Sequence, residues 1–362
     1  MENIFSALLR RDQRERAREY IKGLQRTPGR KSIRNIAQHS GDSSAEQNLH
    51  HFVNGSTWDW QPVRRALAGV LAEEIGETRA WVGYPLVIPK GGSKSVGVQR
   101  RFHPEFGRMV SAQWALGLWM AAESGSAPVN WHMEIPSQTG AGAIVPTLDR
   151  ASTERTGAIV GSLLAQIDPG ESARMLVLDA RGLDAGALIT QLRHVGAPLY
   201  LRVAENYPVE VATRSPTPAW HVASAGAALD LSQRGHYAGA GEPVVYSKAK
   251  VRLPNRPRAD GDLGLWGLDH GVRGRSGTLW LTDVATVHAG SVLRARRLLD
   301  MAAATQDYQL EHLGIRDFSG RSLAGWHRHA TLVSVAHTIR SLRSAATARG
   351  VLTGSRVRAA GA

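Results

Sequence analysis

Acidic side chains, the groups best suited to hold a metal ion, are unevenly placed along this chain. Asp179 directly follows the apolar run Ala173 to Leu178, so it stands at the C-terminal end of an expected buried strand. A carboxylate there could share a metal ion with other acids, or it could simply cap a turn or the next helix. Between Thr78 and Pro104 the chain has no Asp and no Glu. This stretch therefore cannot supply a carboxylate ligand to a metal site.

The overall composition indicates a polyanionic partner. The chain has 362 residues, a formal net charge of +13 and a pI of about 10.6. Such a basic protein commonly binds DNA, RNA or an anionic membrane surface, although an Arg-biased genome would give the same excess of positive charge. The absence of Cys excludes disulfides, thiol nucleophiles and Cys-ligated zinc. No apolar run reaches the roughly 18 residues of a membrane span, so we expect a cytoplasmic protein that binds no membrane.

The first part of the chain, residues 1–76, is predicted to be helical. Leu8 to Leu24 alternates Arg and Glu at helical spacing, which is typical of a solvated helix. Two short helices follow, at Lys31 to His39 and Ala45 to Val53, around the polar turn Gly41 to Ser44. This pattern fits a helix-turn-helix that enters a DNA groove, and it fits a plain helical bundle equally well.

From residue 78 the pattern changes to strands. Arg79 to Ile88, Ser95 to Phe102 and Met109 to Ala122 read as strands, and residues 173–203 read as a strand–helix–strand unit. Residues 206–277, rich in Gly, Pro, Ala and Arg, are expected to form an irregular, β-leaning insertion. The predicted parts are a helical domain at 1–76, an α/β domain at 77–205 and 278–350 interrupted by the insertion, and a basic tail at 351–362.

Several segments together resemble one family. They are REYIKGLQRTPGRKSIRNIAQ (18–38), NLHHFVNGSTWDWQPVRRAL (48–67), PKGGSKSVGVQR (89–100), MLVLDARG (175–182) and LGIRDFSGRSLAGWHRH (313–329). In this order they resemble the DDE transposases of bacterial insertion sequences, in the group that carries a Gly-Trp-His-Arg-His segment. The resemblance implies an α/β fold, a ribonuclease-H-like mixed sheet flanked by helices, with an all-helical N-terminal domain and the insertion described above.

The resemblance also implies a catalytic site that this sequence departs from. In the family, two Asp from strands and one Glu from a late helix hold two Mg²⁺ ions for strand cleavage and transfer. Matching the motifs places Tyr84 and Pro85 where the family has its first acids, Asp179 at the second acid, and Ala303 at the helical Glu. Asp300 and Asp307 lie about one turn from Ala303. Asp179 is thus the one matching acid, and we expect neither a bound metal ion nor another cofactor.

DNA binding needs no metal ion, because Lys and Arg gain affinity by releasing counterions from phosphates. The candidate phosphate contacts are Arg30, Lys31, Arg34, Lys90, Lys94, Arg100, Arg321, His327, Arg328 and His329. Each could instead be a solvated surface charge, and the His-Arg-His trio could pack with Trp326 at the sheet edge. His327 and His329 do not suggest a metal site, because residues two apart on a helix face different ways. By analogy with transposases, a homodimer is also expected.

Three hypotheses follow from these observations. The first is a transposase-like DNA-binding protein that has lost most of its metal site and serves as a domesticated transcription regulator. The second is an active DDE transposase that binds Mg²⁺ through displaced acids such as Glu134, Asp283 or Asp300. The third is a scaffold repurposed for a role without nucleic acid, which an apolar pocket above Asp179 would favour.

Overall fold

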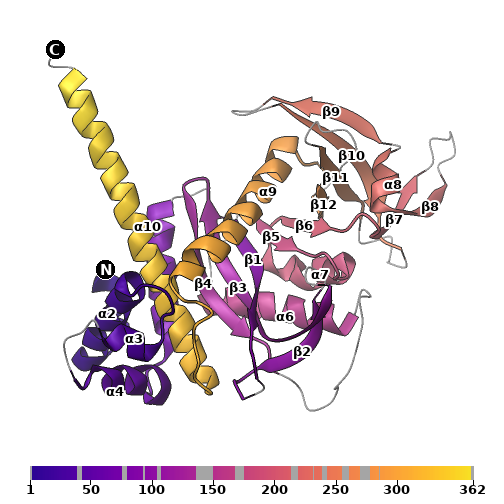
Figure 1. The fold of residues 1–362 in the computed structure, drawn as a ribbon. Helices are drawn as coiled ribbons and strands as arrows, with labels where there is room; N and C mark the ends of the chain where they lie inside the picture. The colour runs from indigo at the N-terminus through magenta and orange to yellow at the C-terminus, as the bar shows by residue number, and fades with distance from the viewer. Residues whose placement is uncertain are drawn as a thin grey trace.

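A twelve-stranded mixed sheet forms the centre of the computed structural model (Figure 1). The structure describes residues 2–359 except 39–42, 76–79, 93, 104–106, 136–149, 168–174, 213–218, 231, 239–242, 255–260, 270–277 and 285. Residues 136–146, whose Gly, Pro and Ser content predicts a loop, therefore lie outside the described residues. The strands follow the order β2-β3-β1-β5-β6-β12-β11-β10-β7-β8, while β4 pairs with β3 and β9 with β10.

The strands predicted from apolar runs form the middle of this sheet. β1 (Ala80–Pro89) pairs in parallel with β5 (Leu176–Asp179), and β5 pairs in parallel with β6 (Leu199–Val203). On its other side β1 pairs with the antiparallel β3 (Arg108–Ala122), which also holds β2 (Val98–His103) and β4 (Gly125–Met133). Central strands are covered on both faces, and this is why their sequences are nearly continuous in apolar residues.

The segment 206–277 is more regular than its sequence suggests. Its elements are β7 (Pro208–Ala212), β8 (Trp220–Ser224), α8 (Ala225–Asp230), β9 (Gln233–Tyr237), β10 (Val244–Arg252) and β11 (Leu263–Asp269). They extend the central sheet through β12 (Thr278–Thr282), at the upper right of Figure 1. The sequence pattern suggests two short strands here, at 244–246 and 250–253. Residues 244–252 instead form one continuous strand, because β11 and β9 pair along most of its length.

Helices cover both faces of the central strands. α6 (Arg150–Ile167) and α7 (Ala185–Leu192) lie on one face, where a Cβ on Gly83 would come within 4.0 Å of Val160. α9 (Ala289–Ala304) crosses the opposite face. Ser291 is the residue type that favours an N-cap, but α9 begins earlier, directly after His288. A π-helical turn, η5 (Thr305–Leu310), follows α9 directly.

The N-terminal helices gather around the first half of the last helix (Figure 1). They are α1 (Glu2–Phe5), α2 (Arg11–Arg26), α3 (Ile33–Ala37), α4 (Ala45–His50), the π-helical η1 (His51–Gly55) and α5 (Trp60–Ile75). α2 is not the fully solvated helix expected from its charges, because Tyr20 and Leu24 are buried. Part of the turn between α3 and α4 lies outside the described residues, so the helix-turn-helix interpretation stays a prediction.

The last helix is longer than predicted. The sequence pattern predicts a helix from Thr331 to Arg349. α10 (Leu323–Ala359) begins eight residues earlier, just before the Gly-Trp-His-Arg-His segment, and continues into the expected basic tail. Its first half is buried beside α2, α5 and β4, and its second half extends beyond the rest of the molecule (Figure 1). Within the described residues, no helix is long and apolar enough to cross a membrane.

Candidate metal locus and nucleic-acid interface

Three adjacent strands bring Tyr84, Asp179 and Arg202 together on one face of the sheet. Gly83 is paired with Leu178, so the next residue of β1, Tyr84, comes beside Asp179 at the end of β5. Asp179 is in turn paired with Arg202 of β6. Side chains at paired positions of parallel strands point the same way. This face is opposite to α6, because the side chain of Leu178 lies on the α6 side with Val160.

The carboxylate of Asp179 is occupied by a neighbouring guanidinium. Arg181 Nε donates to Asp179 Oδ1 at 2.9 Å, and Nη2 donates to Oδ2 at 2.7 Å. The backbone N–H of Arg181 also donates to Oδ1 at 3.2 Å. The Asp179 side chain is 11% exposed and that of Arg181 46%. Such a two-bond pair is one of the stronger arrangements for Arg and carboxylate, and it places a positive charge where the family would place a cation.

The end of α9 reaches the other expected acid positions. Ala303 is half-buried in the last turn of α9, and Asp300 and Asp307 are exposed on either side of it. One turn later, Gln306 Nε2 donates to the backbone oxygen of Pro85 at 2.8 Å, and its Oε1 has no hydrogen-bond partner. Gln306 is not among the site residues that the sequence motifs predict. Its only sequence signal was an amide, similar in shape to Glu, close to the expected position.

The acids proposed to replace the lost ones are engaged elsewhere. Glu134 pairs with Arg101 at 2.6 Å, and Asp300 pairs with Arg296 at 3.4 Å. Asp283 accepts from the backbone N–H of Leu199, at the opposite end of β6 from the residue paired with Asp179. Among the described residues, no three His, Asp or Glu side chains are grouped so that they could hold a metal ion. The displaced triad of the second hypothesis is therefore not found in this part of the chain.

The His-Arg-His trio is built into the protein interior, in keeping with the packing alternative and not with phosphate contact. His329 is 0% exposed between Tyr20 Oη, 2.9 Å from its Nδ1, and the Gly314 oxygen, 2.9 Å from its Nε2. Burial lowers the pKa of His329 to about 4. Arg328 is buried and donates to the backbone oxygens of Trp58 and Val53 at 3.1 Å each. Both Arg328 and His329 are therefore buried and bonded inside the protein.

His327 is held between an aromatic ring and a buried cation. Its imidazole stacks on Trp60 with ring centroids 4.8 Å apart, and Arg64 Nη2 lies 3.2 Å from its Nδ1. Burial, and then the nearby Arg64 charge, lower the pKa of His327 to about 2. A guanidinium has no acceptor, so the contact requires a neutral imidazole whose Nδ1 accepts the bond.

Two predicted phosphate contacts, Lys31 and Lys90, also bond internally. Lys31 is buried, its Nζ donates to the Thr27 oxygen, and its backbone N–H donates to Asp317 Oδ2 at 2.7 Å. Lys90 is half-buried and donates to the backbone oxygen of Phe318 at 2.9 Å. Burial lowers the pKa of both ammonium groups. These lysines join the N-terminal helices and β1 to the segment before α10.

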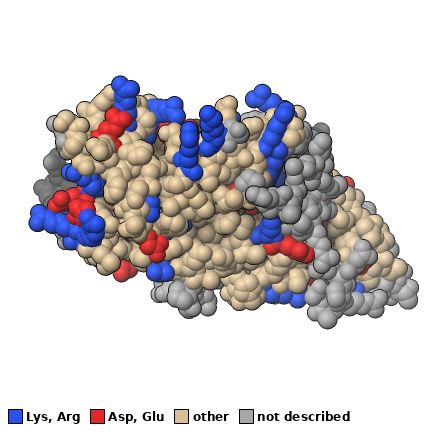
Figure 2. Space-filling view, turned by 90° about the horizontal axis from the view of Figure 1, so that it is seen from below, with Lys and Arg blue, Asp and Glu red and all other residues tan. Residues whose placement is uncertain are grey.

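The remaining predicted contacts are exposed at the surface. They are Arg30, Arg34, Lys94, Arg100 and Arg321. The charge of Arg30 acts on the pKa of Lys90, so the start of α3 and the end of β1 lie close together. In the view from below, Lys and Arg side chains gather along one long edge, while the middle of that face carries few charges (Figure 2).

We predict that Tyr20→Phe destabilises the junction of α2 and α10 measurably. The substitution removes the hydroxyl that donates to His329 Nδ1 and leaves a buried acceptor without a partner. An unsatisfied buried acceptor costs about 1–3 kcal/mol, which urea denaturation followed by circular dichroism would measure. Tyr308→Phe, at a 77% exposed tyrosine, is the matched control. An unchanged midpoint for Tyr20→Phe would contradict the assigned hydrogen bond.

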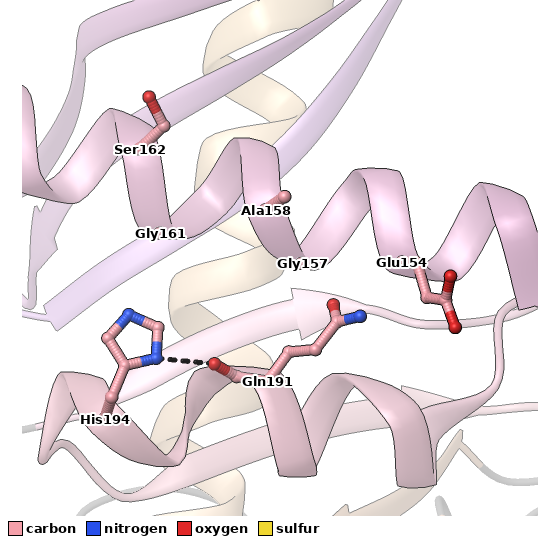
Figure 3. A pocket seen from close by; sticks show the side chains of 7 residues that line it. All are labelled: Glu154, Gly157, Ala158, Gly161, Ser162, Gln191 and His194. Atoms are coloured by element: carbon pink, nitrogen blue, oxygen red, sulfur yellow. Dashed lines mark hydrogen bonds between the residues drawn. The ribbon is translucent and has the colours of Figure 1, made fainter.

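A groove of about 350 Å³ lies between α6 and the end of α7. Figure 3 shows Gln191 and His194 facing Gly157 and Gly161 across it. A Cβ on Gly157 would stand 1.8 Å from Gln191 Oε1, so glycine is what permits this close approach. Because α6 covers the face opposite to Asp179, this groove is not the pocket that the third hypothesis expected above that residue.

The mixed sheet with helices on both faces is that of a ribonuclease-H-like α/β domain, as the sequence predicted. A family model described as DDE superfamily endonuclease matches residues 3–252, more than half of the 362 residues. The chain therefore belongs to the DDE superfamily endonucleases, which confirms the resemblance and implies an interaction with DNA. No curated protein matches the chain.

Proposed function

We propose that this chain is a transposase-like protein that binds DNA without a metal ion and no longer cleaves it. The observation that carries the proposal is the hydrogen-bonded pair between Arg181 and Asp179. The one carboxylate at an expected acid position is neutralised by a guanidinium from its own turn. A divalent cation there would have to displace a charge-assisted, two-bond contact.

The other groups at this locus do not fit a pair of Mg²⁺ ions. Mg²⁺ prefers hard oxygen ligands, with carboxylates to offset its charge. Tyr84 and Pro85, at the first expected acid positions, offer a phenol and a proline instead, and the side-chain amide of Gln306 bonds the backbone oxygen of Pro85. Two divalent cations beside one carboxylate would leave most of their charge uncompensated. Residues of one catalytic constellation fail together, so losing one acid would already remove nearly all activity.

Five exposed basic side chains support the DNA-binding half of the proposal. Arg30, Arg34, Lys94, Arg100 and Arg321 are exposed, and family membership implies a DNA partner. Phosphate contacts by such side chains depend on salt, because each releases condensed counterions from the duplex. A role in regulating transcription would follow from binding without cutting. A homodimer, expected from the resemblance, belongs to the same proposal, and light scattering would measure it.

Gel-shift titration in EDTA tests the binding half. We expect binding that weakens steeply with salt, by about 0.9 log units per log unit of salt for each phosphate contact. Replacing Arg30, Lys94 and Arg321 together by Gln is expected to lower this slope by up to about three. A matched variant loses the same charge at the exposed Lys22, Arg65 and Arg234. No binding, or a salt-independent Kd, would reject DNA binding.

A nicking assay on supercoiled plasmid tests the loss of cleavage. With Mg²⁺ or Mn²⁺ present, we expect wild-type protein and Asp179→Asn to leave the plasmid equally intact. Cleavage by the wild type that Asp179→Asn abolishes would instead favour the active-transposase hypothesis, with ligands outside the described residues.

A further inference from the structure

Arg202 is a cation at the candidate metal locus that has no partner among the residues that the structure describes. It is half-buried on β6, in register with Asp179 on one side and with Trp280 on the other. No hydrogen bond or ion pair joins its guanidinium to any residue that the structure describes. Its guanidinium nitrogens are not among the buried side-chain atoms without a partner, so they reach solvent. An unpaired guanidinium that solvent can reach is open to an anionic ligand.

Among the described residues discussed at this locus, no carboxylate is left to neutralise Arg202. Asp179 is the nearest carboxylate in register, but Arg181 already holds both of its oxygens. Asp184 accepts from the backbone N–H groups of Gly186 and Ala187 as the N-cap of α7. Glu205 lies against Gly226 at the start of α8 and is exposed. Two guanidiniums thus stand beside one carboxylate, an excess that favours an anion.

From this geometry we propose that Arg202 binds a phosphate group directly, at the place where the family would use metal ions, while Arg181 keeps the carboxylate of Asp179 neutralised. The planar donor fork of Arg matches the paired oxygens of a phosphate. Tyr84 lies on the same sheet face, on the strand next to Asp179. The inference rests on the proposed loss of the metal site, and the phosphate is either a DNA phosphodiester or a small phosphate ion.

The first test follows the Nε resonance of Arg202 in ¹⁵N-arginine-labelled full-length protein, in EDTA. Inorganic phosphate and a short DNA duplex are titrated separately, and Arg202→Lys assigns the resonance. A shift with both probes supports a phosphate site that DNA shares. A shift with the duplex alone supports a phosphodiester site, and a shift with phosphate alone supports a small-ion site. No shift of Arg202 with either probe overturns the inference.

A second test uses affinity for the duplex. If the site holds a phosphodiester, Arg202→Gln is expected to weaken binding about tenfold, the typical effect of one charge-assisted hydrogen bond. Arg65→Gln, an exposed arginine on α5, is the matched control. Failure of the inference and failure of the proposed function are distinguishable. Duplex binding without any Arg202 shift rejects the phosphate site alone, whereas a phosphate-induced shift without duplex binding rejects DNA binding alone.

Discussion

Replacing Arg64 by Ala is expected to lower the free energy of unfolding by about 3–5 kcal/mol, the largest effect of any substitution considered. Arg64 is 0% exposed where α5, α10 and β4 meet. Its guanidinium donates to Thr331 Oγ1 at 2.8 Å and to Asn130 Oδ1 at 2.7 Å. It also contacts the Trp131 oxygen and His327. Removing it leaves a cavity and several buried acceptors without donors.

Urea denaturation at neutral pH measures this effect. Arg64→Lys keeps a charge but supplies fewer, differently aimed donors, so we expect an intermediate loss. Arg65→Ala, at the exposed neighbouring residue, is the control for helix α5 and should change stability by less than about 0.5 kcal/mol. Equal stabilities for the Arg64 and Arg65 variants would contradict the assigned role of Arg64 in joining the N-terminal helices to the sheet.

A second large effect is expected in mild acid. Burial lowers the pKa of His329 and His337 to about 4 and, together with the Arg64 charge, that of His327 to about 2. An unfolded His titrates near 6.5, so below that pH the unfolded chain binds protons that the folded chain does not. The stabilisation of the fold by these neutral imidazoles is therefore complete above pH 6.5 and is lost as the pH falls below it. Linkage gives roughly 1–2 kcal/mol per buried His lost at pH 5.

Urea denaturation across a pH series from neutral to mildly acidic would measure this loss. We expect His329→Gln to flatten the pH dependence, because an amide can still accept from Tyr20 and donate to the Gly314 oxygen but does not titrate. His221→Gln, at an exposed histidine, should leave it unchanged. Stability that stays constant between neutral pH and pH 5 would contradict the neutral, buried imidazoles.

The parts of the fold that the sequence predicted are those with long apolar runs. β1, β3 and β5 lie where β-forming apolar residues continue without a break, because central strands are covered on both faces. The individual strands of residues 206–277 could not be located from the sequence pattern. Their short, Gly-interrupted alternations give a weak signal, and they depend on pairing with β12 and on α8 packing against β10 and β11.

Only the part of the candidate site that has a local sequence signal could be predicted. The position of Asp179 could be inferred because an acid after an apolar strand is a local signal. The pairing of Arg181 with it depends on the geometry of the turn, and the contact of Gln306 with Pro85 depends on how α9 crosses β1. Among the basic residues, the sequence could not separate the buried Arg328 from the exposed Arg321, because burial is decided by tertiary packing.

Mn²⁺ titration followed by electron paramagnetic resonance tests the central claim most directly, because Mn²⁺ commonly substitutes for Mg²⁺ in oxygen sites. We predict no saturable Mn²⁺ site in the wild type, and a gain of Mn²⁺ binding when Tyr84→Asp, Ala303→Glu and Arg181→Ala are combined. Saturable binding of Mn²⁺ by the wild-type chain, lost in Asp179→Asn, would contradict the account.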